Sequence, residues 1–219
     1  MINKTTRTMD AGRLMIVPLF TFLLVINIIS IQKEMQAMDF ISTLKAATLM
    51  HHALIVCFYA LWVFLYLKRS SAKSTTNSII AKTAAVVATF IPFAIPAVSR
   101  PVDHYGMMLL ADLVTLSGMI ITLYSLSALG RSVSIIPQAR SLVQSGPYKV
   151  IRHPLYLGEL IAVLGIVLAR ITLPAMALFC VLSALQIYRA LEEERVLAGA
   201  FPEYDSYRMK SARFIPGVF

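Results

Sequence analysis

Long apolar runs separated by short polar segments dominate this chain. An α-helix needs about 20 apolar residues to cross the hydrocarbon core of a bilayer. Four runs in the first part of the chain approach or reach this length, over residues 14–31, 46–67, 79–98 and 107–129. They predict an N-terminal unit, residues 1–129, that consists of four transmembrane helices.

Two further apolar runs, 155–169 and 171–191, are separated only by Arg170. This spacing predicts a helical hairpin whose tip holds Arg170, Thr172 and Pro174, although the run 155–169 is short for a full crossing. The chain is therefore expected to be an all-α integral membrane protein with about six transmembrane helices. Residues 130–219, which contain the hairpin and two polar segments, form the second predicted unit.

The composition supports this interpretation, since 58% of the residues are hydrophobic and 14% are charged, against about a quarter charged in a soluble domain. If the N-terminus is cytoplasmic, the far side of the membrane receives four of the 20 Lys and Arg residues: Lys33, Lys45, Arg100 and Arg170. The positive-inside rule then predicts that both termini are cytoplasmic, in a multi-pass protein of a bacterial inner membrane.

The net charge of +9 is thus explained by topology and by contact with anionic membrane lipids, and no nucleic-acid partner is expected. Cys57 and Cys180 lie inside apolar runs, with no Cys or His at metal-ligand spacing. We therefore expect neither a disulfide nor a metal site, and we interpret both cysteines as packing residues.

This topology brings the polar segment "GPYKVIRHPLYLGE" (146–159) to the cytoplasmic face, beside residues 191–219. Pro154 is expected to start a helix, with His153 as its boundary residue. The first amides of such a helix, of Leu155, Tyr156 and Leu157, would lack intrahelical partners and could bind an anion. The alternative is a helix start with simple interfacial anchors.

Arg189 and Glu193 are four residues apart in the last helix and therefore share a face. We expect the acidic run 192–194 to lie at the end of this helix, where carboxylates do not stabilise a helix, so it either binds a cationic ligand or is a solvated helix end. Glu159 lies one turn inside the fifth helix, where it either contacts a ligand or makes an interhelical hydrogen bond. A zwitterion with a flat base, such as S-adenosylmethionine, would suit these groups.

The segment "GPYKVIRHPLYLGE", followed by "EERVL", "FPEYDSYR" and "RFIP", resembles the isoprenylcysteine carboxyl methyltransferase and phospholipid methyltransferase superfamily. The resemblance covers residues 130–216 and implies an integral-membrane methyltransferase that uses S-adenosyl-L-methionine. It implies a cytoplasmic cofactor pocket formed by residues 130–156 and the C-terminal segment, with Gln138 as an additional candidate contact. The cofactor-binding residues that it implies are Arg140, Ser141, Leu142, Val143, Tyr148, His153, Pro154, Leu155, Tyr156 and Glu193.

The resemblance also implies that Arg189 faces the methyl acceptor and that Arg152 supports the site. Glu159 is a second candidate for acceptor binding because of its position below the expected pocket. Carboxyl O-methylation of a lipidic or small acceptor is the expected reaction, with phospholipid N-methylation and thiol methylation as alternatives. Two other classes remain open, a nicotinamide-dependent sterol-type reductase and a non-catalytic scaffold or transporter subunit. The sequence does not predict an oligomeric state.

Overall fold

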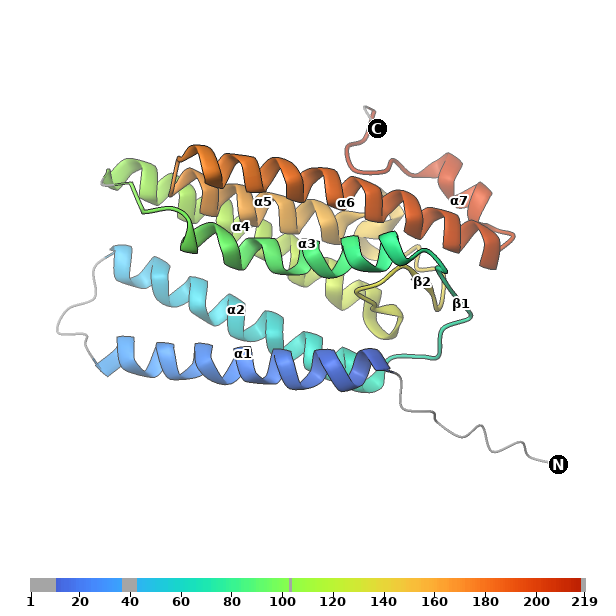
Figure 1. Ribbon diagram of the computed structural model, residues 1–219, viewed down its shortest axis with the longest axis horizontal. Coiled ribbons are helices and arrows are strands. Elements are labelled where there is room, and N and C mark those ends of the chain that lie inside the picture. Colours follow the sequence, from blue (N-terminus) through green and yellow to red (C-terminus); the bar gives the residue numbers. More distant parts are fainter. Residues whose placement is uncertain (1–10, 37–42, 103, 218–219) are drawn as a thin grey trace.

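The structure, a computed structural model, describes residues 11–36, 43–102 and 104–217, and these form an elongated helical bundle (Figure 1). Six helices run along the bundle and a short seventh lies at one end. The α-helices are α1 (Ala11–Gln36), α2 (Thr43–Lys68), α3 (Ile79–Ala97), α4 (Tyr105–Leu129), α5 (Pro154–Leu168), α6 (Leu173–Ala200) and α7 (Tyr204–Lys210).

The predicted all-α membrane architecture is confirmed in its general form. Among the described residues, five helical stretches are long and apolar enough to cross a membrane: Gly12–Lys33, Leu49–Lys68, Ile79–Ala97, Tyr105–Ser132 and Leu173–Ala200. Helix α5 has 15 residues, about 22 Å at 1.5 Å per residue, which is less than the roughly 30 Å of a bilayer core. A sixth crossing and the orientation of the termini therefore stay predictions.

Polar side chains fix where several helices begin. Ser78 accepts a hydrogen bond from the amide of Ala81 at the start of α3 (3.1 Å). Thr172 caps α6 in the same way through the amide of Ala175 (3.4 Å). Such side chains satisfy amides that have no partner within the helix.

Helix α6 is longer than the sequence predicted, because it continues to Ala200 and not to residue 191. The acidic run 192–194 therefore lies inside the helix and about two turns before its end. The expectation that these carboxylates sit at a helix C-terminus was wrong. The surroundings of each of these carboxylates therefore depend on the direction in which its side chain points from α6.

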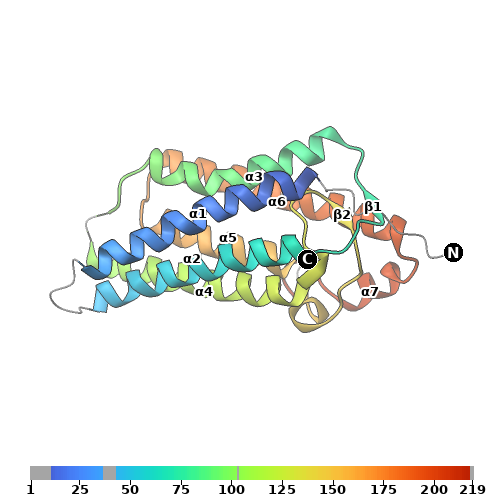
Figure 2. The same ribbon diagram turned by 90° about the horizontal axis from the view of Figure 1, so that it is seen from below.

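The helices associate mainly as three pairs, α1 with α2, α3 with α6 and α4 with α5, and α2 also contacts α4. Figure 2 shows α1 and α2 running side by side along one face of the bundle. The predicted hairpin partners α5 and α6 follow one another in opposite directions along the bundle (Figure 1), but the close packing of α5 is with α4.

Glycines allow α4 and α5 to approach closely. A Cβ atom on Gly118 would overlap the backbone of Ala162, and one on Gly158 or Gly165 would overlap α4 at Thr122 or Thr115. Small residues at a helix interface let two backbones pack together inside a membrane. This contact holds α5 against α4 and so sets the position of the polar residues at the start of α5.

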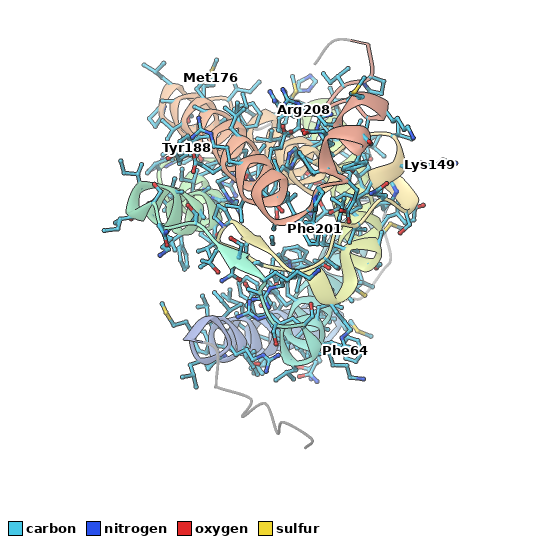
Figure 3. The ribbon with its side chains drawn as sticks, turned by 90° about the vertical axis from the view of Figure 1, so that its right-hand side faces the viewer. Phe64, Lys149, Met176, Tyr188, Phe201 and Arg208 are labelled. Atoms are coloured by element: carbon cyan, nitrogen blue, oxygen red, sulfur yellow. The ribbon has the colours of Figure 1, made fainter. Side chains whose placement is uncertain are left out.

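The non-helical elements lie at one end of the bundle. Strand β1 (Ser74–Thr75) pairs antiparallel with β2 (Gln138–Ala139), and two 3₁₀ turns, η1 (Gly130–Ser132) and η2 (Gly146–Lys149), flank β2. Figure 3 looks onto this end, where Lys149, Phe201 and Arg208 come from three different segments. We refer to it as the polar end.

Cys57 and Cys180 are free cysteines on the exposed surface of the helices. Their interpretation as packing residues was therefore wrong. An apolar run that crosses a membrane contains both core-facing and lipid-facing positions, and its composition does not distinguish them.

Candidate active site

The C-terminal segment meets the start of α5, as the predicted topology requires. The amides of Arg152 and His153 donate to the carbonyls of Ala212 (2.8 Å) and Arg213 (3.1 Å), and Ile151 forms a parallel bridge with Ala212. These contacts place the C-terminal segment beside the helix start that the sequence predicted to be an anion site. The amide of Leu157 also has a partner, since it donates to the His153 carbonyl (3.1 Å), so that part of the prediction was wrong.

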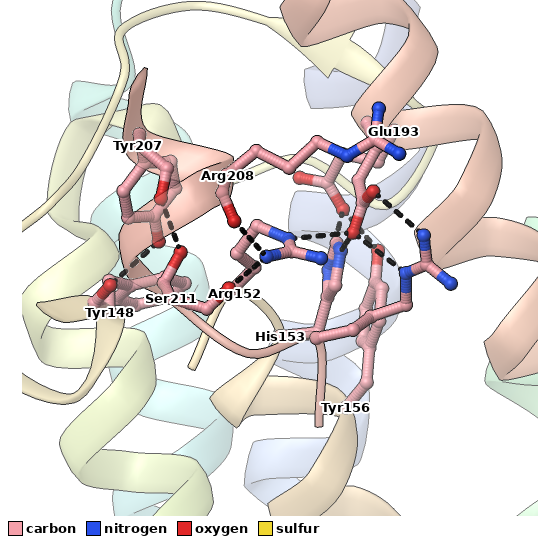
Figure 4. Close-up of polar contacts among 10 residues, drawn as sticks. Tyr148, Arg152, His153, Tyr156, Glu193, Tyr207, Arg208 and Ser211 are labelled. Atoms are coloured by element: carbon pink, nitrogen blue, oxygen red, sulfur yellow. Dashed lines mark hydrogen bonds and ion pairs between the residues drawn. The ribbon is translucent and has the colours of Figure 1, made fainter. Parts of the chain in front are cut away.

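Glu194 is the centre of a buried ion-pair cluster at this junction. Figure 4 shows two of its partners, Arg152 and His153. Its Oε1 lies 3.0 Å from Nε of Arg152 and 3.1 Å from Nε2 of His153. Nε of Arg213 donates to the same oxygen (2.9 Å) and Nη2 of Arg213 donates to Oε2 (3.1 Å). The hydrogen bond to Glu194 raises the pKa of the Arg213 guanidinium.

Arg152 also donates through Nη1 to the carbonyls of Arg208 (3.0 Å) and Ser211. The cluster therefore ties the start of α5 to α6 and to the C-terminal segment. The predicted supporting role of Arg152 has a physical basis in these contacts. Sequence reasoning missed Glu194 and Arg213, since only the rotation of α6 shows which carboxylate of the run 192–194 faces the cations.

Glu193 has a different environment from its neighbour. Its Oε2 accepts a hydrogen bond from the hydroxyl of Tyr156 (2.8 Å) and lies 3.9 Å from Nδ1 of His153. The side chain of Glu193 is 27% exposed, whereas that of Glu194 is 8% exposed. The ring of His153 stacks on that of Tyr156, with centroids 5.5 Å apart and planes at 3°. Glu193 is thus the carboxylate that a ligand can reach.

A small polar cavity of about 30 Å³ lies beside Glu193. We call it the polar cavity. Tyr204, whose buried hydroxyl has no hydrogen-bond partner among the described residues, lies on its wall. The residues named by the sequence analysis that line it are Gln138, Ser141, Leu142, Val143, Tyr148, Arg152, His153 and Glu193.

Three tyrosines of the polar cavity are held in the neutral, hydrogen-bonding form. Burial raises the pKa of Tyr148 well above its usual value and raises that of Tyr204 as well. Burial also raises the pKa of Tyr207 to about 12, and its hydroxyl donates to the carbonyl of Tyr148 (2.7 Å). These phenols therefore remain protonated over the physiological pH range.

A larger cavity of about 350 Å³, which we call the apolar cavity, lies on the other side of Tyr156. Its wall includes side chains from all six long helices, with Phe20, Trp62, Phe93, Met119 and Leu182 among them. The sequence did not indicate this cavity, because most of the residues that line it are ordinary apolar members of separate runs.

The predicted residues Leu155, Tyr156, Glu159 and Arg189 line the apolar cavity. The guanidinium carbon of Arg189 lies 4.7 Å from the centroid of the Tyr156 ring, and Nη2 of Arg189 donates to the Ile135 carbonyl (3.0 Å). Nε of Arg189 is buried and has no hydrogen-bond partner among the described residues.

Two predicted residues lie outside both linings. Pro154 is fully buried at the first position of α5. Arg140 donates to the Ser70 carbonyl and to Oε1 of Gln138 (2.6 Å), so in this structure it joins β2 to the segment after α2. The structure therefore distributes the other predicted site residues over two cavities, whose linings are connected by the hydrogen bond from Tyr156 to Glu193.

Part of the chain is similar to known proteins. Residues 107–204 match the family model described as phospholipid methyltransferase. The cobalt-zinc-cadmium resistance protein CzcN of Cupriavidus metallidurans is 38% identical over 77 residues, which are 35% of this chain and 36% of that protein. The nickel-cobalt-cadmium resistance protein NccN of Alcaligenes xylosoxydans xylosoxydans is 31% identical over 81 residues, which are 36% of this chain and 38% of that protein.

The matched segments thus span little more than a third of these two relatives. The family match covers α4, the polar strip before α5, and α5 and α6 with the Glu193 and Arg189 face. The resemblance found in the motifs is confirmed for this segment. Over residues 107–204 the chain is therefore similar to the integral-membrane methyltransferases of the phospholipid and isoprenylcysteine type.

Proposed function

We propose that this protein transfers a methyl group from S-adenosyl-L-methionine to the carboxylate of an amphiphilic acceptor. The observation that carries the proposal is the arrangement of the two cavities. Tyr156 connects the two linings, since it lines the apolar cavity beside Arg189 and its hydroxyl donates a hydrogen bond to Glu193 of the polar cavity. A water-soluble methyl donor and a lipid-soluble acceptor need two such sites that adjoin.

The residues of the polar cavity fit the chemistry of this cofactor, which supplies an electrophilic methyl group on a sulfonium. Glu193 can bind a cation through its carboxylate. The hydroxyl of Tyr204, which has no hydrogen-bond partner among the described residues, can form a hydrogen bond with the ligand. The aromatic rings of Tyr148 and Tyr207 offer apolar faces to a base. The cavity volume of about 30 Å³ equals the share of one molecule in liquid water, so its walls have to separate when the cofactor enters.

Arg189 is the group that we assign to the acceptor. A carboxylate is ionised near neutral pH and needs no general base, so the enzyme has only to hold it in line with the methyl group. A guanidinium is suited to this task because its donors are planar and fixed in direction. Within the part of the chain that the structure describes, Nε of Arg189 has no hydrogen-bond partner. Positioning of an acceptor by such a group can supply most of the rate.

Phospholipid N-methylation is the second candidate, and the name of the matched family favours it. An ammonium acceptor would first have to lose a proton, and Glu159 on the wall of the apolar cavity could accept it. Thiol methylation would need deprotonation as well. The family match favours both over the sterol-type reductase and the non-catalytic classes.

The metal-resistance names of the two relatives do not lead us to propose metal binding for this chain. Within the described residues, no group of three or more His, Cys, Asp or Glu side chains is arranged to hold a metal ion. We propose instead that the protein lies in a bacterial inner membrane with both termini in the cytoplasm. The polar cavity would then face the cytosol, the source of the cofactor.

Calorimetric titration with S-adenosylhomocysteine tests the proposal on the detergent-purified protein. We expect saturable binding to the wild type and at least about ten-fold weaker binding to Glu193→Gln, since a hydrogen bond to a charged group is lost. Asp112→Asn is the matched control, because Asp112 is a carboxylate of α4 that lines neither cavity. Absence of binding to the wild type would rule out the proposed function.

A further inference from the structure

One buried hydrogen bond links α2 to the strip between α4 and α5. The hydroxyl of Tyr66, near the C-terminal end of α2, accepts a hydrogen bond from the amide of Ile135 (2.9 Å). Tyr66 is 1% exposed and Ile135 is 6% exposed, so water does not compete for this contact. Tyr66 lies outside the segment 107–204 that matches the family model. The contact therefore joins the N-terminal helices to the segment that carries the candidate site.

Ile135 is also the residue to which Arg189 is tied. Its carbonyl accepts a hydrogen bond from Nη2 of Arg189 (3.0 Å), while its amide donates to Tyr66. Residue 135 lies between η1 and β2 and belongs to neither. Hydrogen bonds of a helix or a sheet therefore do not fix its main chain, and the two side chains from α2 and α6 hold it from opposite sides of the residue.

The Ile135 carbonyl is well placed to set the orientation of the Arg189 guanidinium. Nη1 of Arg189 donates to Oε1 of Gln186 (2.8 Å), which belongs to the same helix. Among the hydrogen bonds described for Arg189, the one to Ile135 connects it to another element. The donors of a guanidinium lie in one plane, so a shift of the Ile135 carbonyl turns the plane that faces the Tyr156 ring, 4.7 Å away.

We propose that Tyr66 is a positioning residue for methyl transfer: its hydroxyl holds the main chain of Ile135, which in turn orients Arg189. The inference rests on the proposed function for the role of Arg189, and it goes beyond that function by giving the N-terminal helices a part in the reaction. Tyr66 lines neither of the two described cavities, so it acts through residue 135. Small displacements of a group that aligns a reactant have large effects on rate.

Tyr66→Phe separates this role from packing. The ring of Tyr66 contacts Trp62, with centroids 5.4 Å apart, and the guanidinium carbon of Arg69 lies 4.1 Å from its centroid. Phenylalanine keeps a ring for both contacts and removes the hydroxyl. Tyr124→Phe is the matched control, because Tyr124 is a 58% exposed tyrosine of α4 that lines neither described cavity.

The test measures acceptor use and cofactor affinity separately in the detergent-purified protein. Transfer of a radiolabelled methyl group to S-farnesyl-cysteine and to a total lipid extract, at low acceptor concentration, gives the first. Titration with S-adenosylhomocysteine gives the second. We expect Tyr66→Phe to lower the transfer rate about ten-fold, the effect of a buried donor that loses its partner, with the cofactor affinity unchanged. Tyr124→Phe should change neither quantity.

A double-mutant cycle tests whether Tyr66 acts through Arg189. Residues in one chain of contacts have non-additive effects. In the Arg189→Lys background, which keeps a cation but lacks the planar group tied to Ile135, Tyr66→Phe should lower the rate by less than about two-fold. Hydrogen exchange of the wild type needs no variant, and it should show the amide of Ile135 exchanging more slowly than in an unfolded chain.

A wild-type transfer rate in Tyr66→Phe would overturn the inference, as would an equal fall in rate and in cofactor affinity, which indicates general destabilisation. A full ten-fold loss in the Arg189→Lys background, or an unprotected Ile135 amide, would overturn it as well. Absence of methyl transfer by the wild type to both acceptors would overturn the proposed function together with this inference. Transfer by the wild type that Tyr66→Phe leaves unchanged would overturn the inference alone.

Discussion

Two adjacent carboxylates of α6 have different tasks. Glu194 is paired with Arg152, His153 and Arg213 in a buried cluster, whereas Glu193 accepts a hydrogen bond from Tyr156 on the wall of the polar cavity. The first arrangement stabilises the junction of three segments. The second leaves a charge available to a ligand.

Glu194→Gln should therefore lower the free energy of unfolding by about 3 kcal/mol, because it removes one partner from buried cations. Glu193→Gln should change it by less than about 1 kcal/mol, as expected for a partly exposed group. Denaturation of the two purified variants in the same detergent measures both effects. An equal loss of stability in the two variants would contradict the assignment of a stabilising role to Glu194 alone.

For single residues, the sequence predicted which side chains share a helix face but not which carboxylate of the acidic run lines a cavity. The spacing of four residues placed Arg189 and Glu193 on one side of a helix, and both lie on that side at neighbouring cavities. The choice between Glu193 and Glu194 depends on how α6 is rotated against α5. That rotation is decided by the whole bundle and is not visible in a local pattern.

At the scale of elements, the contact of α4 with α5 positions the site. Helix α5 starts at the Arg152 and His153 cluster and carries Tyr156 and Glu159, so any shift of α5 moves both cavity walls. The contact depends on glycines where a Cβ atom would meet the backbone of the other helix, as at Gly118.

Gly118→Ala should destabilise the protein by about 3 kcal/mol or more, because the added methyl group overlaps the backbone of Ala162 and overpacking of a tight contact is costly. Gly199→Ala is the matched control on α6, since an added Cβ there meets nothing within 4 Å. That control should be neutral or stabilising by up to about 1 kcal/mol through helix propensity. Thermal unfolding in detergent measures both variants, and a neutral Gly118→Ala would contradict the described packing.

The sequence predicted the positions of the helices better than it predicted which helices pack against each other. Apolar runs located four spans, and the start of the fifth, within a few residues, since length and hydropathy are local properties. The hairpin prediction linked α5 to α6 because they adjoin in the sequence, but the glycines select α4 as the close neighbour. The extension of α6 to Ala200 was missed because its last turns are polar and carry no membrane signal.

For the whole molecule, the two cavities explain why a polar motif occurs in an apolar chain. The segment 146–159 provides His153 and Tyr148 to the polar cavity and Tyr156 and Glu159 to the apolar cavity. Tyr156 lines the apolar cavity and contacts both Glu193 of the polar cavity and Arg189 of the apolar cavity. Composition alone predicted a membrane protein, and the motif predicted a cofactor, but only the assembled bundle shows the apolar cavity.

The central claim is that Arg189 serves the acceptor and Glu193 serves the cofactor, and the most direct test measures both properties of Arg189→Ala. Transfer of a radiolabelled methyl group from S-adenosylmethionine to S-farnesyl-cysteine and to a total lipid extract gives the turnover. Titration with S-adenosylhomocysteine gives the cofactor affinity. We predict that turnover falls about 100-fold, equivalent to roughly 2.7 kcal/mol of transition-state stabilisation, while the cofactor affinity stays within about two-fold. A parallel loss of cofactor affinity, or unchanged turnover, would contradict the account.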